Sequence, residues 1–487
     1  MGPLHQLLKK STVMVLSEIY FLALSLSCVS TDLSPVEDTI IYTLPQCIEI
    51  AIKNNPQVRT VTWQSATDKA YWRGNTASML PFVNGNVSHG INQGRSIDPF
   101  TNSYIDQRVS IGSYNLNASL NLWNGLSQRE ATRQSKLAYE SDVLDERQAE
   151  QNIAISTTLA YLQVLNAEQQ LGQAVRQTAV TMQQVRRLQA LDSIGSIAPA
   201  LLYDLQGQLS GDRINELNIE SSLESARLTL AQLMNVPYSG TMKFSPLSNE
   251  TILATGDVQQ PTAAALLAQP GVRAAGLRMQ STAKGLQAAK GARQPTLYLA
   301  GNIGTNYSSA ASRASLLNVT EVPTADYVFV GAEKVPVYTS QRVYNNTAIP
   351  YGDQWRNNVF SSLSLGVRVP LVSGGQLRQR IELAEVAASK AAYEAQTISS
   401  QLQRSIEQAT INLDFARKRY LQFAKQANDF EQSFRAAEVR FNAGLGTVVD
   451  YLAAKNNLDR ARSGLIASRF ECLLLGKVLE YYVEPGT

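Results

Sequence analysis

The 487-residue sequence predicts a mixed α and β membrane protein, in which short barrel strands are followed by long antiparallel coiled-coil helices. Three observations indicate this fold class. An ordered set of motifs occurs twice, short segments alternate between apolar and polar residues, and two long runs contain almost no proline or glycine. The prediction is therefore an elongated chain with four barrel strands and two helical hairpins, built by internal duplication.

The amino terminus, residues 1–30, resembles a secretory signal peptide. Lys9 and Lys10 precede the apolar segment "IYFLALSLSC" (19–28), which is too short to cross a bilayer as a helix. Simple cleavage and lipid attachment at Cys28 both remain open. No later stretch of about 20 apolar residues follows, so we expect an exported protein without a transmembrane helix.

Three pairs of motifs indicate that one structural plan occurs twice. Residues 121 and 370 differ by 249, as do residues 195 and 444, so the later motifs align without a gap. The pairs are "NPQVR" (55–59) with "QPGVR" (269–273), "NLWNG" (121–125) with "PLVSG" (370–374), and "GSIAPALLYDLQGQL" (195–209) with "GLGTVVDYLAAKNNL" (444–458). The predicted division is a signal peptide (1–30), a first repeat (44–236), a linker at the waist of the helical part (237–260) and a second repeat (261–483).

Each repeat contains two segments with the pattern of membrane strands. Residues 114–123 and 362–371 alternate apolar with polar residues, and segments 83–92 and 297–307 do so less regularly. An apolar face toward lipid and a polar face toward a wet lumen fit this alternation, although a half-buried sheet in a soluble domain is the alternative. Four strands leave two open edges, which lipid does not tolerate, so several chains must assemble, and three would supply twelve strands.

Two helical runs follow the strand pairs, over residues 124–193 and 375–442. At about 1.5 Å per residue each is a rod of roughly 100 Å. Apolar residues in the second rod recur at steps of three and four, which predicts a left-handed coiled coil. That seam is Ile406, Ala409, Leu413, Ala416, Tyr420, Phe423, Ala427, Phe430, Phe434, Ala437 and Phe441. The weaker seam of the first rod is Ile153, Ala160, Val164, Ala167, Leu171, Val175, Met182 and Val185.

Composition argues against several classes of function. The formal net charge of +3 gives no strong field for nucleic acid, so no nucleic-acid partner is expected. Only two histidines occur, His5 and His89, and His5 falls in the predicted signal peptide. Catalysis that depends on histidine, or a zinc site with histidine ligands, would have to use His89. We expect no enzyme, no catalytic residues, no metal and no cofactor.

The ordered motifs resemble the TolC family of outer-membrane efflux proteins. The likeness is carried by "LWNG" (122–125), "LVSGG" (371–375) and "FNAGLGTVVDYLAAKN" (441–456), within a duplicated plan from about Leu44 to Tyr482. The resemblance implies a homotrimer whose twelve strands form one β-barrel in the outer-membrane lipid of a Gram-negative bacterium. A periplasmic tunnel of antiparallel coiled-coil helices would continue that barrel.

The same resemblance implies the function. Such proteins are exit ducts that work with a periplasmic adaptor protein and an inner-membrane transporter, and they are not enzymes. The transporter selects the cargo, so a drug, a metal, a protein and a polysaccharide all stay open. A surface-anchored structural or adhesin-type coiled-coil protein is the alternative, but a simple anchor has no need of two strand pairs per chain.

The family pattern also points to a gate at the helical tips. An aromatic residue, a glycine and an acid six positions after that glycine correspond here to Phe441, Gly444 and Asp450. Phe441 has no hydroxyl for a latch. The first copy has Gly195 and, nine positions later, Asp204. Rings of three acids at a narrow neck would favour cations, whereas an acid that only complements a helix N-terminus is the simpler alternative.

Four further expectations concern turns, junctions, cysteines and loops. Gly195, Gly444 and Gly446 should permit the hairpin turns. The strand-to-helix junctions should lie at Trp123, Gly125, Gly374 and Gly375, with Trp123 in an aromatic girdle. Cys47 and Cys472 are able to pair in an oxidising compartment, but two buried free thiols are the favoured interpretation. Residues 308–358 should form an external loop.

Overall fold

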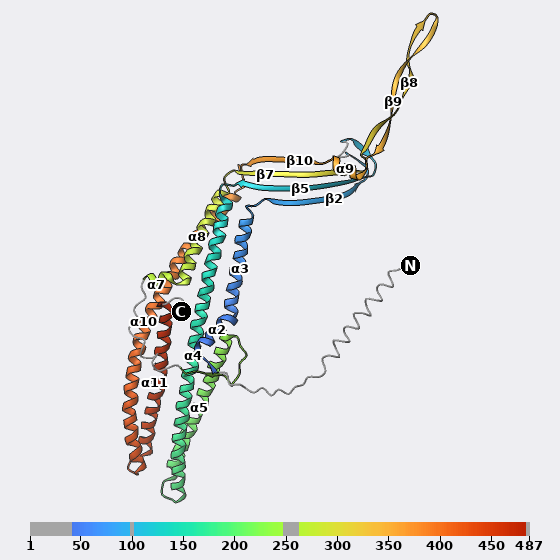
Figure 1. Ribbon diagram of the computed structural model, residues 1–487. Helices are drawn as coiled ribbons and strands as arrows, with labels where there is room; N and C mark the ends of the chain where they lie inside the picture. Colours follow the sequence, from blue (N-terminus) through green and yellow to red (C-terminus); the bar gives the residue numbers. More distant parts are fainter. Residues whose placement is uncertain (1–40, 98–101, 247–262, 484–487) are drawn as a thin grey trace, which may run out of the picture.

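The computed structural model describes residues 41–97, 102–246 and 263–483. The molecule is elongated, with a strand region at one end and a bundle of long helices at the other (Figure 1). The predicted signal peptide lies outside the described residues, as does most of the linker.

Four antiparallel strands form the main sheet, in the spatial order β10-β7-β5-β2. They are β2 (Phe82–Asn92), β5 (Val109–Trp123), β7 (Thr296–Ser308) and β10 (Phe360–Arg368). The predicted strand positions are confirmed. Polar residues Asn84, Asn117, Asn302 and Ser362 lie side by side in one row across all four strands. The neighbouring row, on the other face, is Val83, Ala118, Gly301 and Leu363.

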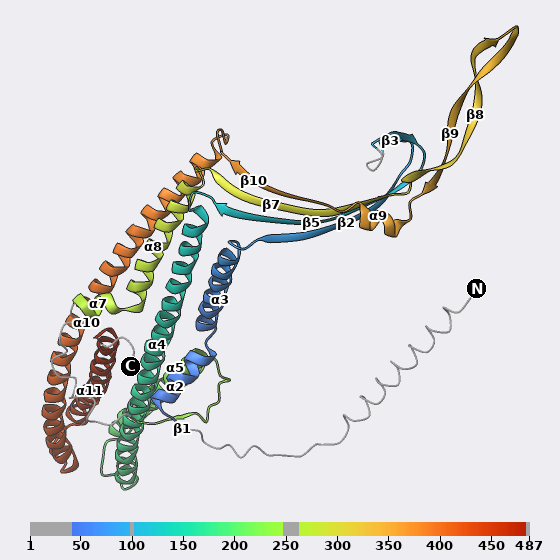
Figure 2. The same cartoon turned by 45° about the horizontal axis from the view of Figure 1, so that its top comes forward.

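The prediction of a loop over residues 308–358 is wrong. Most of this segment forms a two-stranded ribbon, β8 (Ser312–Val330) with β9 (Glu333–Ala348), followed by helix α9 (Tyr351–Asn357). Valine, tyrosine and threonine favour strands, and Gly331 takes φ +71° in the tight turn between them. A smaller ribbon joins β3 (Arg95–Ile97) to β4 (Tyr104–Asp106). Figure 2 shows both ribbons starting at the end of the sheet away from the helices.

Two helical hairpins form the other end of the molecule. Helices α4 (Ser127–Ser193) and α10 (Gln376–Asn442) have 67 residues each, and α5 (Pro199–Met234) and α11 (Val448–Val483) have 36 each. The shorter helices are α2 (Leu44–Asn54), α3 (Pro56–Ala77), α7 (Ala263–Ala268) and α8 (Pro270–Gly291). Helix α3 packs on α4 near the sheet, and α8 packs between α4 and α10. In the described ranges, no helix has both the length and the apolar character needed to cross a membrane.

The predicted seam of the second rod is confirmed, because each of its members is buried or half-buried. In the first rod, the prediction that Val175 belongs to the buried seam is wrong, because this side chain is 46% exposed. Ala174, Thr178 and Thr181 are buried in its place. A helix with 3.6 residues per turn drifts relative to a strict heptad, and the contact surface of α4 follows that drift.

The waist of the helical bundle holds the largest apolar core. Cys47 and Ala51 of α2 pack there with Tyr161 of α4 and Met234 of α5. Strand β1 (Ile41–Tyr42) pairs in parallel with β6 (Lys243–Phe244), which anchors the start of the linker. Cys47 and Cys472 are buried and free, as expected.

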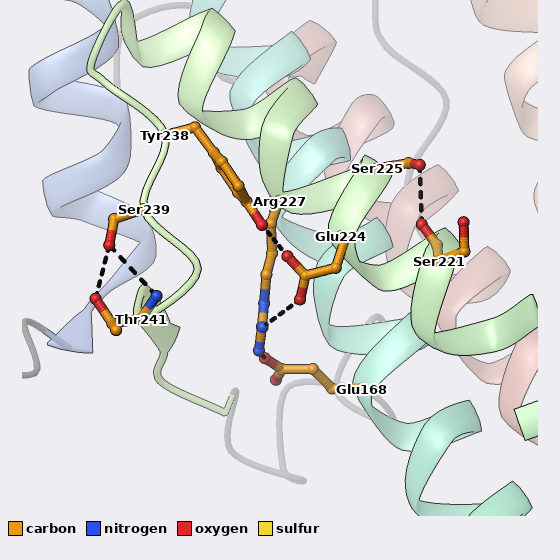
Figure 3. A network of polar contacts seen from close by, with 8 residues as sticks. All are labelled: Glu168, Ser221, Glu224, Ser225, Arg227, Tyr238, Ser239 and Thr241. Carbon is orange, nitrogen blue, oxygen red and sulfur yellow. Dashed lines mark hydrogen bonds and ion pairs between the residues drawn. The ribbon is translucent and has the colours of Figure 1, made fainter. Parts of the chain in front are cut away.

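Polar contacts fix the linker against the first hairpin at the same height (Figure 3). Arg227 of α5 lies 2.9 Å from Glu168 of α4 and 3.0 Å from Glu224 of its own helix. The hydroxyl of Tyr238, in the linker, donates a hydrogen bond to Glu224. The Arg227 side chain is only 15% exposed, so solvent screens this ion pair less than it screens a surface pair.

Candidate functional site at the helical tips

The helical tips are the turns over residues 194–198 and 443–447, where the two hairpins reverse direction. Gly195 takes φ +69° and Gly444 takes φ +75°, a backbone conformation that favours glycine. Gly446 has no positive φ. A Cβ at Gly446 would lie 3.2 Å from the backbone nitrogen of Phe441, so a close approach is the reason for this glycine. All three glycines lie in the turns that the sequence predicts.

Asp450 lies in the first turn of α11 and is exposed. The Thr447 hydroxyl donates to its Oδ2 over 2.7 Å, and the Asp450 backbone N–H donates to Thr447 Oγ1 over 3.1 Å. This exchange caps the N-terminus of α11, where a negative charge also complements the helix dipole. Asp450 therefore has a capping role, and its carboxylate also faces solvent at the tip.

Asp204 is the acid near the tip of the first hairpin, at a position that is not equivalent to Asp450; it lies near the start of α5 and is also exposed. No hydrogen bond or ion pair joins Asp204 to Asp450 in the part of the chain that the structure describes. The two acids thus lie at separate tips within one chain, and any ring of acids would need further copies.

An apolar cluster packs the two tips together. We call it the tip cluster; its buried members are Val185, Leu188, Leu202, Leu205, Leu209, Phe441, Val448 and Tyr451. They come from all four long helices. Phe441 is 8% exposed and stacks on Tyr451, with ring centroids 4.8 Å apart. Phe441 is consequently a packing residue inside the cluster.

Tyr451 carries a polar atom into this apolar cluster. The residue is fully buried, and its hydroxyl has no hydrogen-bond partner. Burial raises the pKa of Tyr451 well above its ordinary value, with nearby Glu438 adding to the effect. A buried hydroxyl without a partner destabilises the folded state.

A buried ion network links the hairpins just above the tip cluster, and sequence reasoning missed it. Lys455 of α11 is 2% exposed and lies 2.9 Å from Asp212 of α5 and 2.8 Å from Asp459. Asp212 also accepts hydrogen bonds from Thr181 of α4 at 2.5 Å and from Gln208 at 2.7 Å. These five residues are the Lys455 network. Burial raises the pKa of Asp459, and Lys455 partly offsets that shift.

One signal for this network was present in the sequence. Lys455 continues the buried stripe of α11 formed by Val448, Tyr451 and Leu458, and an acid follows it four residues later. A lysine in an apolar stripe requires a partner, because an unpaired buried charge is costly.

A second polar link lies closer to the turn. Arg187 of α4 donates to the side chain of Asn442, and it donates to the Asn442 carbonyl oxygen over 2.7 Å. A guanidinium at the C-terminus of α10 satisfies a free carbonyl and complements the helix dipole. Both polar links therefore join the first hairpin to the second.

Comparison with known proteins decides the family. The family described as "Outer membrane efflux protein" matches residues 47–236 and 263–471, which is most of the chain. The chain belongs to the outer membrane efflux protein family. Members of this family are outer-membrane channels, not enzymes. The protein is therefore an outer-membrane protein. The resemblance derived from the sequence motifs is confirmed.

Individual relatives agree with this assignment. The Outer membrane protein TolC of Vibrio cholerae serotype O1 is 21% identical over 442 residues, which cover 90% of this chain and 89% of that protein. The Campylobacter jejuni CmeC outer membrane channel superposes with a TM-score of 0.74 at 15% identity, over 90% of this chain and 85% of that one. VceC, an outer membrane protein of Vibrio cholerae, superposes with a TM-score of 0.71 at 15% identity, over 90% of this chain and 95% of that one. These structural likenesses show a shared fold.

The junction residues of this efflux protein connect sheet and helices. Trp123 ends β5 and is 43% exposed. A Cβ at Gly125 would lie 2.3 Å from the Gln294 side chain, so glycine permits close packing just before α4. Gly374 and Gly375 directly precede α10. Among the described residues, no group of three or more histidine, cysteine or acidic side chains is placed to hold a metal ion.

Proposed function

We propose that this outer membrane efflux protein is the exit duct of a tripartite export system. Three copies form one twelve-stranded barrel, and their helices form a tunnel in the periplasm. A periplasmic adaptor and an inner-membrane transporter deliver cargo to the tunnel. The observation that carries the proposal is the four-stranded sheet. Its edge strands β2 and β10 have no further partner among the described residues, and its polar row lies opposite an apolar row.

The dimensions of the sheet support a membrane crossing. Tyr114, Tyr307, Tyr351 and Trp355 form an aromatic group at one end, with Tyr114 and Trp355 centroids 4.6 Å apart, and Trp123 lies at the other end. The part of β5 from Tyr114 to Trp123 is about 30 Å long. If the strand is tilted by about 40° from the barrel axis, this part spans about 23 Å along that axis. Aromatic girdles of transmembrane barrels flank an apolar band of similar height.

The helical tips are the proposed gate. Three copies of Asp450, and at another height three copies of Asp204, would surround the axis of the tunnel. Rings of carboxylates at a narrow opening favour cations and repel anions. The tip cluster and the Lys455 network hold the hairpins together, so these contacts stabilise the closed state. Asp450 keeps its capping role in this scheme.

The division of the chain is part of the same proposal. Residues 1–30 are removed as a signal peptide, residues 44–236 and 261–483 are duplicated repeats, and residues 237–260 link them. Equal lengths of 67 residues for α4 and α10, and of 36 for α5 and α11, support a duplication.

Three measurements test the proposed function. Light scattering in detergent should give about three times the 53.3 kDa of one chain, somewhat less after removal of the signal peptide, and planar bilayers should show cation-selective conductance. A stable monomer without conductance would contradict the barrel. Cross-linking in intact cells, followed by purification of the tagged chain, should recover an inner-membrane transporter and thereby indicate the cargo.

A further inference from the structure

We propose that the β8–β9 ribbons of neighbouring copies pair edge to edge, β9 of one copy against β8 of the next, and form a six-stranded collar outside the barrel. The proposal rests on the trimer of the proposed function. The partner that binds the ribbon edge is therefore a second copy of this chain.

The base of the ribbon is fixed to the main sheet by one buried side chain. Gln354 of α9 is 1% exposed, and it accepts a hydrogen bond from the Ser308 backbone over 2.9 Å. Its amide nitrogen donates to the carbonyl oxygens of Ser308 at 3.0 Å and Ile349 at 2.9 Å. The end of β7 and the residue after β9 are thus held together, so the ribbon leaves the sheet in a defined direction.

The ribbon itself is too exposed to be complete alone. Among the described residues, β8 and β9 form a sheet of only these two strands. An isolated two-stranded ribbon is marginally stable in water, and its outer edges present unpaired backbone groups. Its exposed large apolar residues are Leu316, Leu317, Val319, Tyr327, Val328, Phe329, Val330, Val335, Tyr338, Val343 and Tyr344.

The charges of the two strands are complementary. Strand β8 carries two acids, Glu321 and Asp326, with Arg313 at its base. Strand β9 carries two bases, Lys334 and Arg342, with Glu333 beside the turn. Lys334 lies over the ring of Tyr327, with its nitrogen 4.3 Å from the centroid. Within the described part of the chain, no ion pair is formed by Glu321, Asp326 or Arg342. The β8 edge of the ribbon therefore has a net charge of about −1 and the β9 edge a net charge of about +1, with the opposite charges Arg313 and Glu333 at the two ends of the ribbon.

Threefold symmetry brings these opposite edges together. A ring of three copies uses the same heterologous contact three times, so β8 of one copy meets β9 of the next. The strands run in opposite directions, so this contact is antiparallel. Copies related by a threefold axis along the barrel keep equal heights. Arg342 lies opposite Val319 in its own chain, two residues from Glu321, so the basic edge meets the acidic edge at matching levels.

The test uses mixed trimers with two differently tagged chains, one carrying Thr320→Cys and the other carrying Gln341→Cys. Two alternative variants, Thr339→Cys and Val343→Cys, replace Gln341→Cys in parallel experiments. They cover the case in which the strands of neighbouring copies are shifted by two residues along their length. We expect oxidation to give disulfide-linked dimers that contain both tags, and Thr320→Cys alone to give none. The charge reversal Glu321→Lys with Asp326→Lys should abolish the mixed-tag dimer. Adding Lys334→Glu with Arg342→Glu should restore it.

The outcomes separate this inference from the proposed function. Replacement of residues 312–348 by a short turn should leave the trimer mass and the conductance in place. An intact trimer without mixed-tag dimers at any cysteine pair would overturn the collar alone, as would cross-linking of the ribbon only to lipopolysaccharide or to another protein. A monomer in detergent would overturn both proposals.

Discussion

The Nζ atom of Lys455 lies 2.9 Å from a carboxylate oxygen of Asp212, so a buried ion pair joins α11 of the second hairpin to α5 of the first. We predict that Lys455→Met weakens the contact between hairpins by about 3–5 kcal/mol, because Asp212 and Asp459 then face each other without a cation. Thermal unfolding should occur at lower temperature, and conductance in planar bilayers should rise as the closed state loses stability.

Lys418→Met is the matched control for that variant. Lys418 forms a 2.7 Å pair with Asp414 within α10, but its side chain is 65% exposed. Exposed pairs of this kind contribute about 0–1 kcal/mol, so both readouts should stay close to those of the unmodified protein. Equal behaviour of the two variants would show that the Lys455 network does not hold the hairpins.

The two proposed roles of Asp450 are separable by mutation. Asp450→Asn removes the charge, so we expect lower cation selectivity and weaker blockade by multivalent cations. Thr447→Ala removes the capping hydroxyl and keeps the charge, so it should lower stability by about 1 kcal/mol and leave selectivity unchanged. If Asp450→Asn changes stability alone, Asp450 is only a cap.

Asp142 of α4 should make stability depend on pH. Burial, followed by contact with Asp68, raises the pKa of Asp142 from 3.8 to about 7. An acid whose folded pKa is raised favours the folded state at low pH, and this contribution is lost as pH rises from about 4 through 7. Asp142→Asn should therefore raise the unfolding temperature at pH 8 relative to the unmodified protein, with little difference at pH 4.5. The control Asp414→Asn, at an exposed position, should not change the unfolding temperature in this pH-dependent way.

The tip cluster allows a stabilising substitution beside a destabilising one. Tyr451→Phe removes a buried hydroxyl without a partner, so the unfolding temperature should stay equal or rise. Phe441→Ala leaves a cavity in the same cluster and should cost about 3–5 kcal/mol. A clear loss of stability in Tyr451→Phe would mean that the hydroxyl finds a partner in the trimer.

The buried cysteines should resist labelling. Burial raises the pKa of the Cys47 thiol to about 12 and also raises that of Cys472, so neither residue supplies much thiolate at pH 8. In a chain carrying Cys28→Ser, a maleimide should label two thiols after denaturation and none in the native trimer. Rapid native labelling would show that the waist core around Cys47 opens.

Local patterns were sufficient for the elements that carry strong periodicity. Alternation located β5 and β10, and the near absence of proline and glycine located α4 and α10 almost to their ends. The ribbon over residues 312–348 was missed because its prolines and polar residues suggested a loop, whereas cross-strand pairing overrides such composition. Lys455 was missed for a different reason. Whether a charged residue in an apolar stripe is buried depends on Asp212, 243 positions away in the sequence.

The unequal lengths of the paired helices have a mechanical consequence. Helices α5 and α11 accompany α4 and α10 for only 36 residues, or about 54 Å, and α3 and α8 take over beyond the waist. In the proposed gate, the first hairpin would therefore act as a lever whose fulcrum lies where Arg227 fixes the waist. A tilt of about 10° at that height would displace the tip by about 7 Å and leave the sheet undisturbed, since the arm from Arg227 to Pro199 is about 42 Å long.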